Sequence, residues 1–383
     1  MKKFYFVLIL AILASYGNQT IKDKNAGGSN SVTQAVLNRA KKTTDNIIAS
    51  TAVTKTKAAS KSIKSKNTTP IKLIFDTDMD SDVDDVGALA MLHALMTNGE
   101  VEILAVMVSS TCPGSAACAD AINTYYGRPD IPIGIKKGKG VNRDVGYVGK
   151  VAAKFPNNIK SGDDIPDAKV LYRQILAGLP DKSVKILSVG YFTNLEDLLK
   201  TPGDSISNLN GRDLVQSKVT EYVCTGGEYP SDLSFQGNGN FEPDGKAVKY
   251  VNKHWPTMLT FTAGEHYFWD IKTGASLLKE DTNINPVAFA YKEFFSRVTW
   301  DRNYPDHHSA DQTGVYVAVK GFKNKYTLTK TLGYFYIWDN GLCEWRTDLK
   351  MPLRRISYSL KEPYKESAIN LANEINSLML QKP

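Results

Sequence analysis

Apolar and polar residues alternate in blocks from residue 71 to residue 262, with short apolar runs separated by amphipathic segments. Continuous apolar runs are typical of strands buried on both faces of a parallel sheet, and the segments between them have helical spacing. The pattern predicts strands at 72–75, 101–108, 131–135, 184–189, 219–225 and 258–262, and helices at 84–97, 116–126, 168–179, 194–200 and 244–254. This βαβ order predicts an α/β fold with an open, mostly parallel, Rossmann-like sheet that carries helices on both faces.

The last third of the chain has a different pattern. Segments 286–298 and 311–319 have helical spacing, and segment 326–346 alternates around Asp339-Asn340-Gly341, which is typical of a β-hairpin. A final amphipathic helix is predicted from an apolar face of Ala368, Leu371, Ala372, Ile375, Leu378 and Met379. Because no second low-complexity linker occurs, we expect these elements to be appended to one domain, residues 71–383.

The first 70 residues lack this regular pattern. Two lysines precede an apolar run at 4–14, which is too short to span a membrane but has the length of a signal-peptide core, so residues 1–16 are predicted to be a signal peptide. Residues 17–70 are rich in Ser, Thr, Lys, Ala and Asn without sustained periodicity, which predicts a disordered basic linker. We therefore expect an exported protein, periplasmic or extracellular, without a stable membrane anchor.

The positive charge of the chain is concentrated in this N-terminal segment. The net charge is +7, but residues 20–70 carry ten Lys or Arg against two Asp. Without that segment and Lys2 and Lys3, the remainder has a net charge near −3. Because nucleic-acid binding depends on basic surfaces, the composition gives no reason to expect a nucleic-acid partner for the folded part.

Residues 76–85, DTDMDSDVDD, place six carboxylates between the first predicted strand and the first predicted helix. Like charges this close raise one another's pKa or require a counter-ion, and carboxylate oxygens suit calcium, magnesium or manganese. Helix capping explains the acids at the helix start, Asp84 and Asp85. It does not explain Asp76 and Asp78, which leave the strand on one side of it. A metal site is therefore predicted at the carboxyl end of this strand, where open α/β sheets bind their ligands.

Further motifs follow the aspartate loop in a fixed order. After Asp76-Thr-Asp78 and Asp84-Asp85 come Gly190-Tyr-Phe-Thr193-Asn194-Leu195, Gly226-Gly227, Asn240-Phe241, Trp255-Pro256 and Asp311-Gln312-Thr313. In this order and spacing the chain from about residue 71 onward resembles the inosine-uridine preferring nucleoside hydrolases, in a secreted bacterial-type branch with an aspartate loop two residues longer. The resemblance implies a calcium-dependent enzyme that hydrolyses the N-glycosidic bond of ribonucleosides to ribose and free base. It also implies a small-molecule nucleoside as substrate and a homo-oligomer, a dimer or tetramer.

The resemblance assigns the metal ligands by motif. It implies a Ca²⁺ site formed by Asp78, Asp85, the carbonyl of Val189, and Asp311. Asp78 would also be the general base that takes a proton from a calcium-bound water. Asp76 would support the ligands from behind, and in the longer loop Asp82 would share that role or replace one of the ligands. Anionic groups suit this reaction because departure of the base leaves an oxocarbenium-like sugar.

The substrate contacts implied by the resemblance come from the aspartate loop and from later motifs. Asp84 and Asn240 would bind the ribose hydroxyls. Asn238 stands where the family commonly has an acid, and its amide can hydrogen-bond a hydroxyl but adds no negative charge opposite a cationic sugar. Apart from the resemblance, an aromatic side chain that stacks on a protonated purine is another route to a better leaving group, with Tyr229, Trp300 and Tyr304 as candidates.

Two further positions depart from the family pattern and leave alternatives open. Asp80 stands where the loop normally has a glycine, and Ala310 stands where many members have a histidine before the last metal aspartate. His307 and His308 are either solvated loop residues or, as we predict for His308, the source of a catalytic proton. One alternative is a non-catalytic or degenerate calcium-dependent nucleoside or sugar-binding protein. It is motivated by Asn238, by Ala310 and by the absence of an asparagine that the family often has after the second strand, where this chain reads Ser109-Ser110-Thr111. A phosphatase of the haloacid dehalogenase type, which also begins with a strand and Asp-x-Asp, is a weaker alternative.

Overall fold

The computed structural model describes residues 69–234, 239–262, 267–298, 303–322 and 328–383. The predicted signal peptide (1–16), nearly all of the predicted linker (17–70), Asn238 and Trp300 lie outside these ranges. Among the described residues, no helix has both the length and the apolar character needed to cross a membrane.

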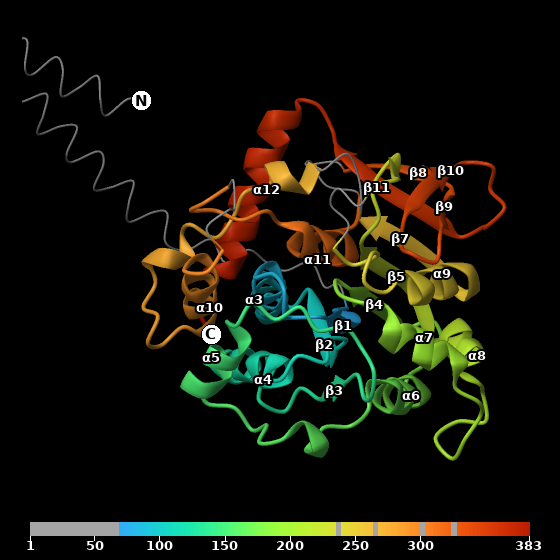
Figure 1. Cartoon of the computed structure of the whole chain (residues 1–383), viewed down its shortest axis with the longest axis horizontal. Coiled ribbons are helices and arrows are strands. Elements are labelled where there is room, and N and C mark those ends of the chain that lie inside the picture. The colour runs from blue at the N-terminus through green and yellow to red at the C-terminus, as the bar shows by residue number, and fades with distance from the viewer. Residues whose placement is uncertain (1–68, 235–238, 263–266, 299–302, 323–327) are drawn as a thin grey trace, which may run out of the picture. The chain divides into compact units, whose positions relative to one another are not determined.

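The folded part is built on an eight-stranded sheet with the order β3-β2-β1-β4-β5-β7-β11-β8 (Figure 1). All neighbours pair in parallel except β11 and β8. The strands are β1 (Ile71–Thr77), β2 (Val101–Val108), β3 (Ile133–Ile135), β4 (Val184–Ser188), β5 (Val219–Thr225), β7 (Met258–Thr262), β8 (Leu328–Leu332) and β11 (Arg354–Leu360). The predicted α/β fold with an open, mostly parallel sheet is confirmed. Because the chain order reverses between β1 and β4, a crevice is expected where these two strands end.

Helices cover both faces of the sheet, because alternate residues of each strand point to opposite sides. In β1, Leu73 and Phe75 pack into one apolar cluster and Ile74 packs into another. The first cluster contains side chains of α3 (Asp84–Thr97), α4 (Ser115–Tyr125), α5 (Val148–Lys154), α10 (Pro286–Phe295), α11 (Ala310–Lys320) and α12 (Tyr364–Met379). The second contains side chains of α6 (Ala168–Gly178), α7 (Thr193–Lys200), α8 (Gly211–Lys218) and α9 (Gly245–His254).

The C-terminal elements differ in part from the prediction. The hairpin around Gly341 forms between β9 (Tyr334–Ile337) and β10 (Cys343–Arg346), and β6 (Ser231–Asp232) completes a three-stranded sheet. β8, which the alternating pattern placed in the same hairpin, instead joins the main sheet beside β11. Gly333, with φ +157°, lies between β8 and β9 at this change of direction.

Several short elements were not predicted from the sequence. They are the helices α5 and α8, the strands β6 and β11, and the 3₁₀ turns η1 (Gly162–Asp164), η2 (Tyr267–Asp270) and η3 (Leu277–Lys279). Most are only one or two turns or a few residues long, so their sequences show too little periodicity to recognise. One of them, η2, contributes to the site described next.

Candidate active site

A cavity of about 300 Å³ lies beyond the carboxyl ends of β1, β4 and β5, beside the start of α11. This is the edge at which the chain order reverses between β1 and β4, the usual ligand position in open α/β sheets. Of the residues predicted from the sequence, the cavity is lined by Asp78, Asp82, Asp84, Asp85, Val189, Asn240, His308 and Asp311. The fold thus brings together residues from widely separated motifs.

Asp84 and Asp85 are the first residues of α3, yet neither caps it. The N-cap position of α3 is Val83, and no side chain accepts a hydrogen bond there. Asp84 Oδ2 instead accepts the backbone N–H of Asp311 at 3.2 Å, and Asp85 Oδ1 accepts the hydroxyl of Thr77. Both acids are buried. The prediction that helix capping explains Asp84 and Asp85 is therefore wrong, because both carboxylates accept hydrogen bonds from groups outside the first turn of α3.

Three carboxylates form a candidate cation site. Asp84, Asp85 and Asp311 each offer an oxygen atom, and these atoms lie within 4.8 Å of one another. Burial, followed by the charges of neighbouring aspartates, raises the pKa of Asp311 and Asp84 well above the usual range. A cation would remove this repulsion, and a buried all-oxygen set suits a hard ion such as Ca²⁺. The residues present therefore fit a divalent cation.

Asp78 belongs to the same group of acids. Its side chain is buried and lines the cavity, and its pKa is raised well above the usual range by burial and then by the charges of Asp85 and Asp80. Gly190, after β4, packs so closely against this residue that a Cβ there would clash with the Asp78 backbone amide. The glycine of this motif therefore lets the end of β4 approach the exit of β1.

We expect the cation-free protein to lose stability as the pH rises. Burial raises the pKa of Asp76 to about 8 and that of Asp85 to about 7. Because unfolded aspartates have a pKa near 4, the folded state holds protons that the unfolded state releases. The resulting stability is present below about pH 4 and is lost as the pH rises through about 7 to 8. Melting temperatures measured with a chelator should therefore fall from about pH 5 to about pH 8.

Added Ca²⁺ should raise the melting temperature most at the upper end of this range, because ionised carboxylates bind it without releasing a proton. A chelated protein whose melting temperature is constant or rises between these pH values contradicts the prediction.

Val189 and Asn240 join the ends of two strands. The side-chain amide of Asn240 donates to the carbonyl of Val189 at 2.6 Å and to the carbonyl of Thr225 at 3.1 Å. A carbonyl oxygen has two lone pairs, so Val189 can still offer one to a cation. Asn240 contributes its nitrogen to holding β4 and β5 together, which leaves its oxygen for the predicted ribose contact.

Asp76 lies behind the cavity rather than in its lining. It is fully buried, and its carboxylate accepts hydrogen bonds from the hydroxyl of Tyr172 at 2.8 Å and the amide of Asn194 at 3.3 Å. These partners come from α6 and α7. The position fits the supporting role predicted for Asp76, because it ties the exit of β1 to two helices on one face of the sheet.

Asp80 faces away from the cavity. Its carboxylate accepts hydrogen bonds from Ser110 Oγ at 2.5 Å, the backbone N–H of Arg143 at 3.1 Å and the Tyr191 hydroxyl at 3.2 Å. The preceding residue, Met79, has φ +40° and takes the left-handed conformation needed in the turn. The loop therefore turns without a glycine, and Asp80 anchors it by hydrogen bonds.

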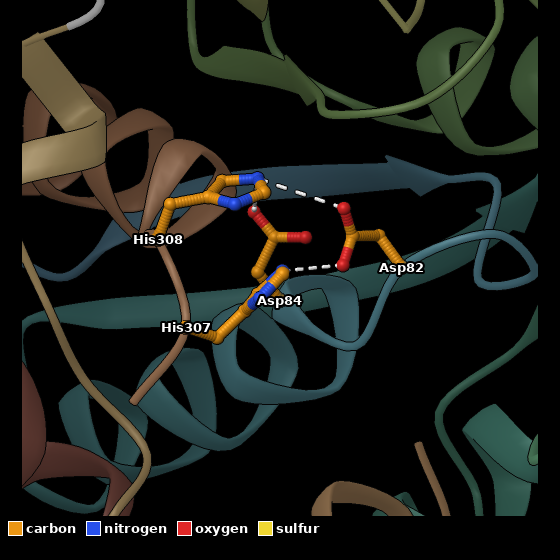
Figure 2. A group of neighbouring side chains, drawn as sticks. All are labelled: Asp82, Asp84, His307 and His308. Atoms are coloured by element: carbon orange, nitrogen blue, oxygen red, sulfur yellow. Dashed lines mark ion pairs between the residues drawn. The ribbon is translucent and has the colours of Figure 1, made fainter. Parts of the chain in front are cut away.

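Asp82 is not a member of the group formed by Asp84, Asp85 and Asp311. Its carboxylate instead forms an ion pair with His307, and Oδ2 lies 3.6 Å from His308 Nε2 (Figure 2). Burial raises the pKa of Asp82, but the attraction of the two imidazoles outweighs it and lowers the pKa to about 2. Asp82 is therefore a partner of histidines, a contact that the sequence did not suggest.

Sequence reasoning also missed two aromatic residues of the cavity. Phe268 and Trp269 of η2 line it, and the Trp269 ring centroid lies 4.2 Å from that of His308. The only sequence signal is the aromatic run at residues 267–269 shortly after β7. Such runs are more often part of a core, and Tyr267 of the same turn is indeed fully buried.

Two of the three predicted stacking residues, Tyr229 and Tyr304, lie outside the described lining of the cavity. Tyr229 stacks on Tyr358, with ring centroids 4.7 Å apart, and its contact with a substrate stays a prediction. Tyr304 is 63% exposed and packs edge-on against Phe295. Asn238 and Trp300 lie outside the described residues.

Comparisons with known proteins agree with the fold. No protein-family model matches the chain, and no curated protein matches it. Among solved structures, a plant nucleoside hydrolase, PpNRh1, superposes with a TM-score of 0.61 at 17% identity over 82% of this chain and 100% of its own. The chain has the nucleoside hydrolase fold.

Two further solved structures have a similar fold. A purine-preferring ribonucleoside hydrolase from Gardnerella vaginalis gives a TM-score of 0.55 at 14% identity, covering 80% of this chain and 99% of that one. The type III effector protein XopQ, complexed with adenosine diphosphate ribose, gives a TM-score of 0.56 at 14% identity. The match covers 82% of this chain and 95% of XopQ. Since likeness at these identities establishes only the fold, function has to be argued from the site.

Proposed function

We propose that this protein hydrolyses the N-glycosidic bond of ribonucleosides to ribose and free base. The observation that carries the proposal is the meeting of Asp78, Asp84, Asp85 and Asp311 in one cavity at the switch point of the sheet. The likeness to nucleoside hydrolases of known structure supports it. A compact group of buried acids suits a reaction in which the sugar becomes positively charged as the base departs.

The cation of this reaction would be held by Asp85 and Asp311 of the three-carboxylate group, together with Asp78 and the carbonyl of Val189 from the same cavity lining. Asp84, the third member of that group, would face the ribose hydroxyls. When bound, Ca²⁺ would supply positive charge that attracts ribose hydroxyls and makes a water molecule more acidic. Asp78 then takes a proton from the attacking water, because it lies in the cavity among the other acids. Asp84 accepts hydrogen bonds from the ribose hydroxyls, and the negative charge of the group stabilises the cationic sugar.

His308 is the group we assign to the departing base. It lines the cavity, and its ring packs against that of Trp269 with centroids 4.2 Å apart. An imidazole that gives a proton to the base as the C–N bond breaks converts a poor leaving group into a good one. This role replaces the histidine that many members of the resembled family have at the position of Ala310.

A calcium-dependent binding protein without catalysis is the second candidate. Ala310 lines the cavity directly before Asp311 and can donate no proton. The effector XopQ, which has a similar fold, is described in complex with adenosine diphosphate ribose. A protein of this kind would bind a nucleoside or its sugar and release nothing.

The two candidates are separated by a panel of nucleosides incubated with the purified protein and Ca²⁺. We expect release of free ribose, measured as reducing sugar, from at least one purine or pyrimidine ribonucleoside. If no nucleoside yields ribose but one raises the melting temperature, the binding protein is the correct candidate. If there is neither release nor stabilisation, both candidates are rejected.

A further inference from the structure

The carboxylate of Asp82 contacts two histidines at once. Oδ1 pairs with Nε2 of His307, and Oδ2 lies 3.6 Å from Nε2 of His308 (Figure 2). The two imidazoles are adjacent, with ring centroids 4.0 Å apart. One acid from the loop after β1 therefore contacts two neighbouring residues that lie just before Ser309, the N-cap residue of α11.

Asp82 is itself held in place by its neighbours. The backbone N–H of Val83 donates to Asp82 Oδ1 at 2.9 Å, and the hydroxyl of Tyr147 donates to the Asp82 carbonyl at 2.6 Å. Tyr147 is fully buried at the start of α5. Its contact fixes the backbone of the loop, and the Val83 contact fixes the direction of the side chain.

The two histidines have different surroundings. His307 is fully buried, and its ring packs edge-on against Phe294 with centroids 5.0 Å apart. His308 lines the cavity, where its ring lies against Trp269 and Nε2 is 3.9 Å from Asp84 Oδ2. Of the two, only His308 can therefore reach a molecule in the cavity.

We propose that Asp82 is a positioning residue, which holds His308 toward the cavity through its contacts with both imidazoles so that His308 can protonate the departing base. The inference rests on the proposed function and names a residue that acts through another. As the C–N bond breaks, its electron pair goes to the base nitrogen and the proton of His308 joins that nitrogen. Water adds to the anomeric carbon and gives its own proton to Asp78, so that ribose and neutral base result.

A metal ion is the other occupant that this group of residues permits. Asp82, Asp84, His307 and His308 offer atoms within 4.8 Å of one another, and mixed imidazole and carboxylate ligands suit transition metals. The contacts favour the ion pairs instead, because Asp82 Oδ1 already accepts from Val83 and pairs with His307. A metal at this place is therefore an outcome that the experiment has to detect.

The test compares two substrates that differ in their need for a proton. A natural nucleoside requires protonation of the base, whereas p-nitrophenyl β-D-ribofuranoside does not, because nitrophenolate leaves readily as an anion. We expect Asp82→Asn to lower kcat/KM for the nucleoside at least about tenfold and to change it little for the nitrophenyl riboside. His308→Gln should show a larger loss in the same direction. The double variant should be no worse than His308→Gln, because both changes remove one function.

Asp339→Asn is the control for the same chemical change. It breaks an ion pair with Lys249 on an exposed surface and should leave kcat/KM for both substrates unchanged. The inference is overturned if Asp82→Asn lowers kcat/KM equally for both substrates, or lowers it for neither. It is also overturned if the wild-type protein binds a transition metal that Asp82→Asn loses, as measured by elemental analysis. A wild-type protein that hydrolyses neither substrate refutes the proposed function itself, which is a distinguishable result.

Discussion

Replacing Asp78 by asparagine is expected to lower kcat for nucleoside hydrolysis at least about a thousandfold. Asparagine keeps the size of the side chain but cannot accept a proton from water, and it is a weaker ligand for a cation. The loss combines a missing general base with a weakened ion site, so it should exceed that of other substitutions in the loop. The measurement is ribose release at saturating substrate and Ca²⁺.

Asp80→Asn is the comparison for this variant. Asp80 belongs to the same loop and is equally buried, but its carboxylate faces Ser110 and Tyr191 rather than the cavity. We expect it to reduce stability and to reduce turnover less than about tenfold, since its hydrogen bonds only hold the loop. Similar losses of turnover in both variants, or retained turnover in Asp78→Asn, would remove Asp78 from the mechanism.

Removing divalent cations is expected to abolish nucleoside hydrolysis, with a loss of at least about a hundredfold. Without a cation, the acids at the cavity keep protons, because burial and mutual repulsion raise the pKa of Asp85 to about 7 and that of Asp78 well above its usual value. Protonated carboxyl groups can neither accept the proton of water nor stabilise a cationic sugar. The measurement is turnover after exhaustive dialysis against a chelator, followed by return of single metals.

Ca²⁺ should restore more activity than Mg²⁺, since it accepts about 6–8 oxygen ligands in flexible geometry whereas Mg²⁺ requires a near-octahedral set. Isothermal titration with Asp85→Asn and Asp311→Asn should show weakened Ca²⁺ binding in each. Full activity of the chelated protein would exclude a cation from the reaction. Restoration by Mg²⁺ alone would assign a different ion to the site.

The aspartate loop carries more acids than a cation site needs, and the structure separates their positions. Asp78, Asp84 and Asp85 line the cavity, whereas Asp76 and Asp80 are buried away from it as acceptors for hydroxyl and amide groups. Asp82 pairs with histidines. The aspartates of one loop therefore have three different roles: they line the cavity, accept hydrogen bonds away from it, or pair with histidines. The loop is curved, so its side chains point in different directions.

Much of the fold was predictable because it depends on short-range patterns. Apolar runs and helical spacing placed β2, β5, β7 and α3 at their observed bounds. Strand pairing is a long-range property, which explains the error at β8. The alternating sequence of β8 is compatible with a hairpin with β9 and with a place beside β11. In the folded protein β8 pairs with β11 of the main sheet, and the sequence of β8 alone does not specify this partner.

The sequence by itself determined the α/β fold and the position of the acidic loop, since both follow from patterns among residues close in the chain. It also indicated Asp78, Asp84, Asp85 and Asp311 as a group, through motifs in order. Only the tertiary structure decided that Asp80 turns away from the cavity, that Tyr229 packs on Tyr358, and that Trp269 and Asp82 meet the histidines before α11. The partner of a side chain depends on which distant segments the fold brings near it. The local sequence pattern therefore does not predict which of several aspartates contacts which partner.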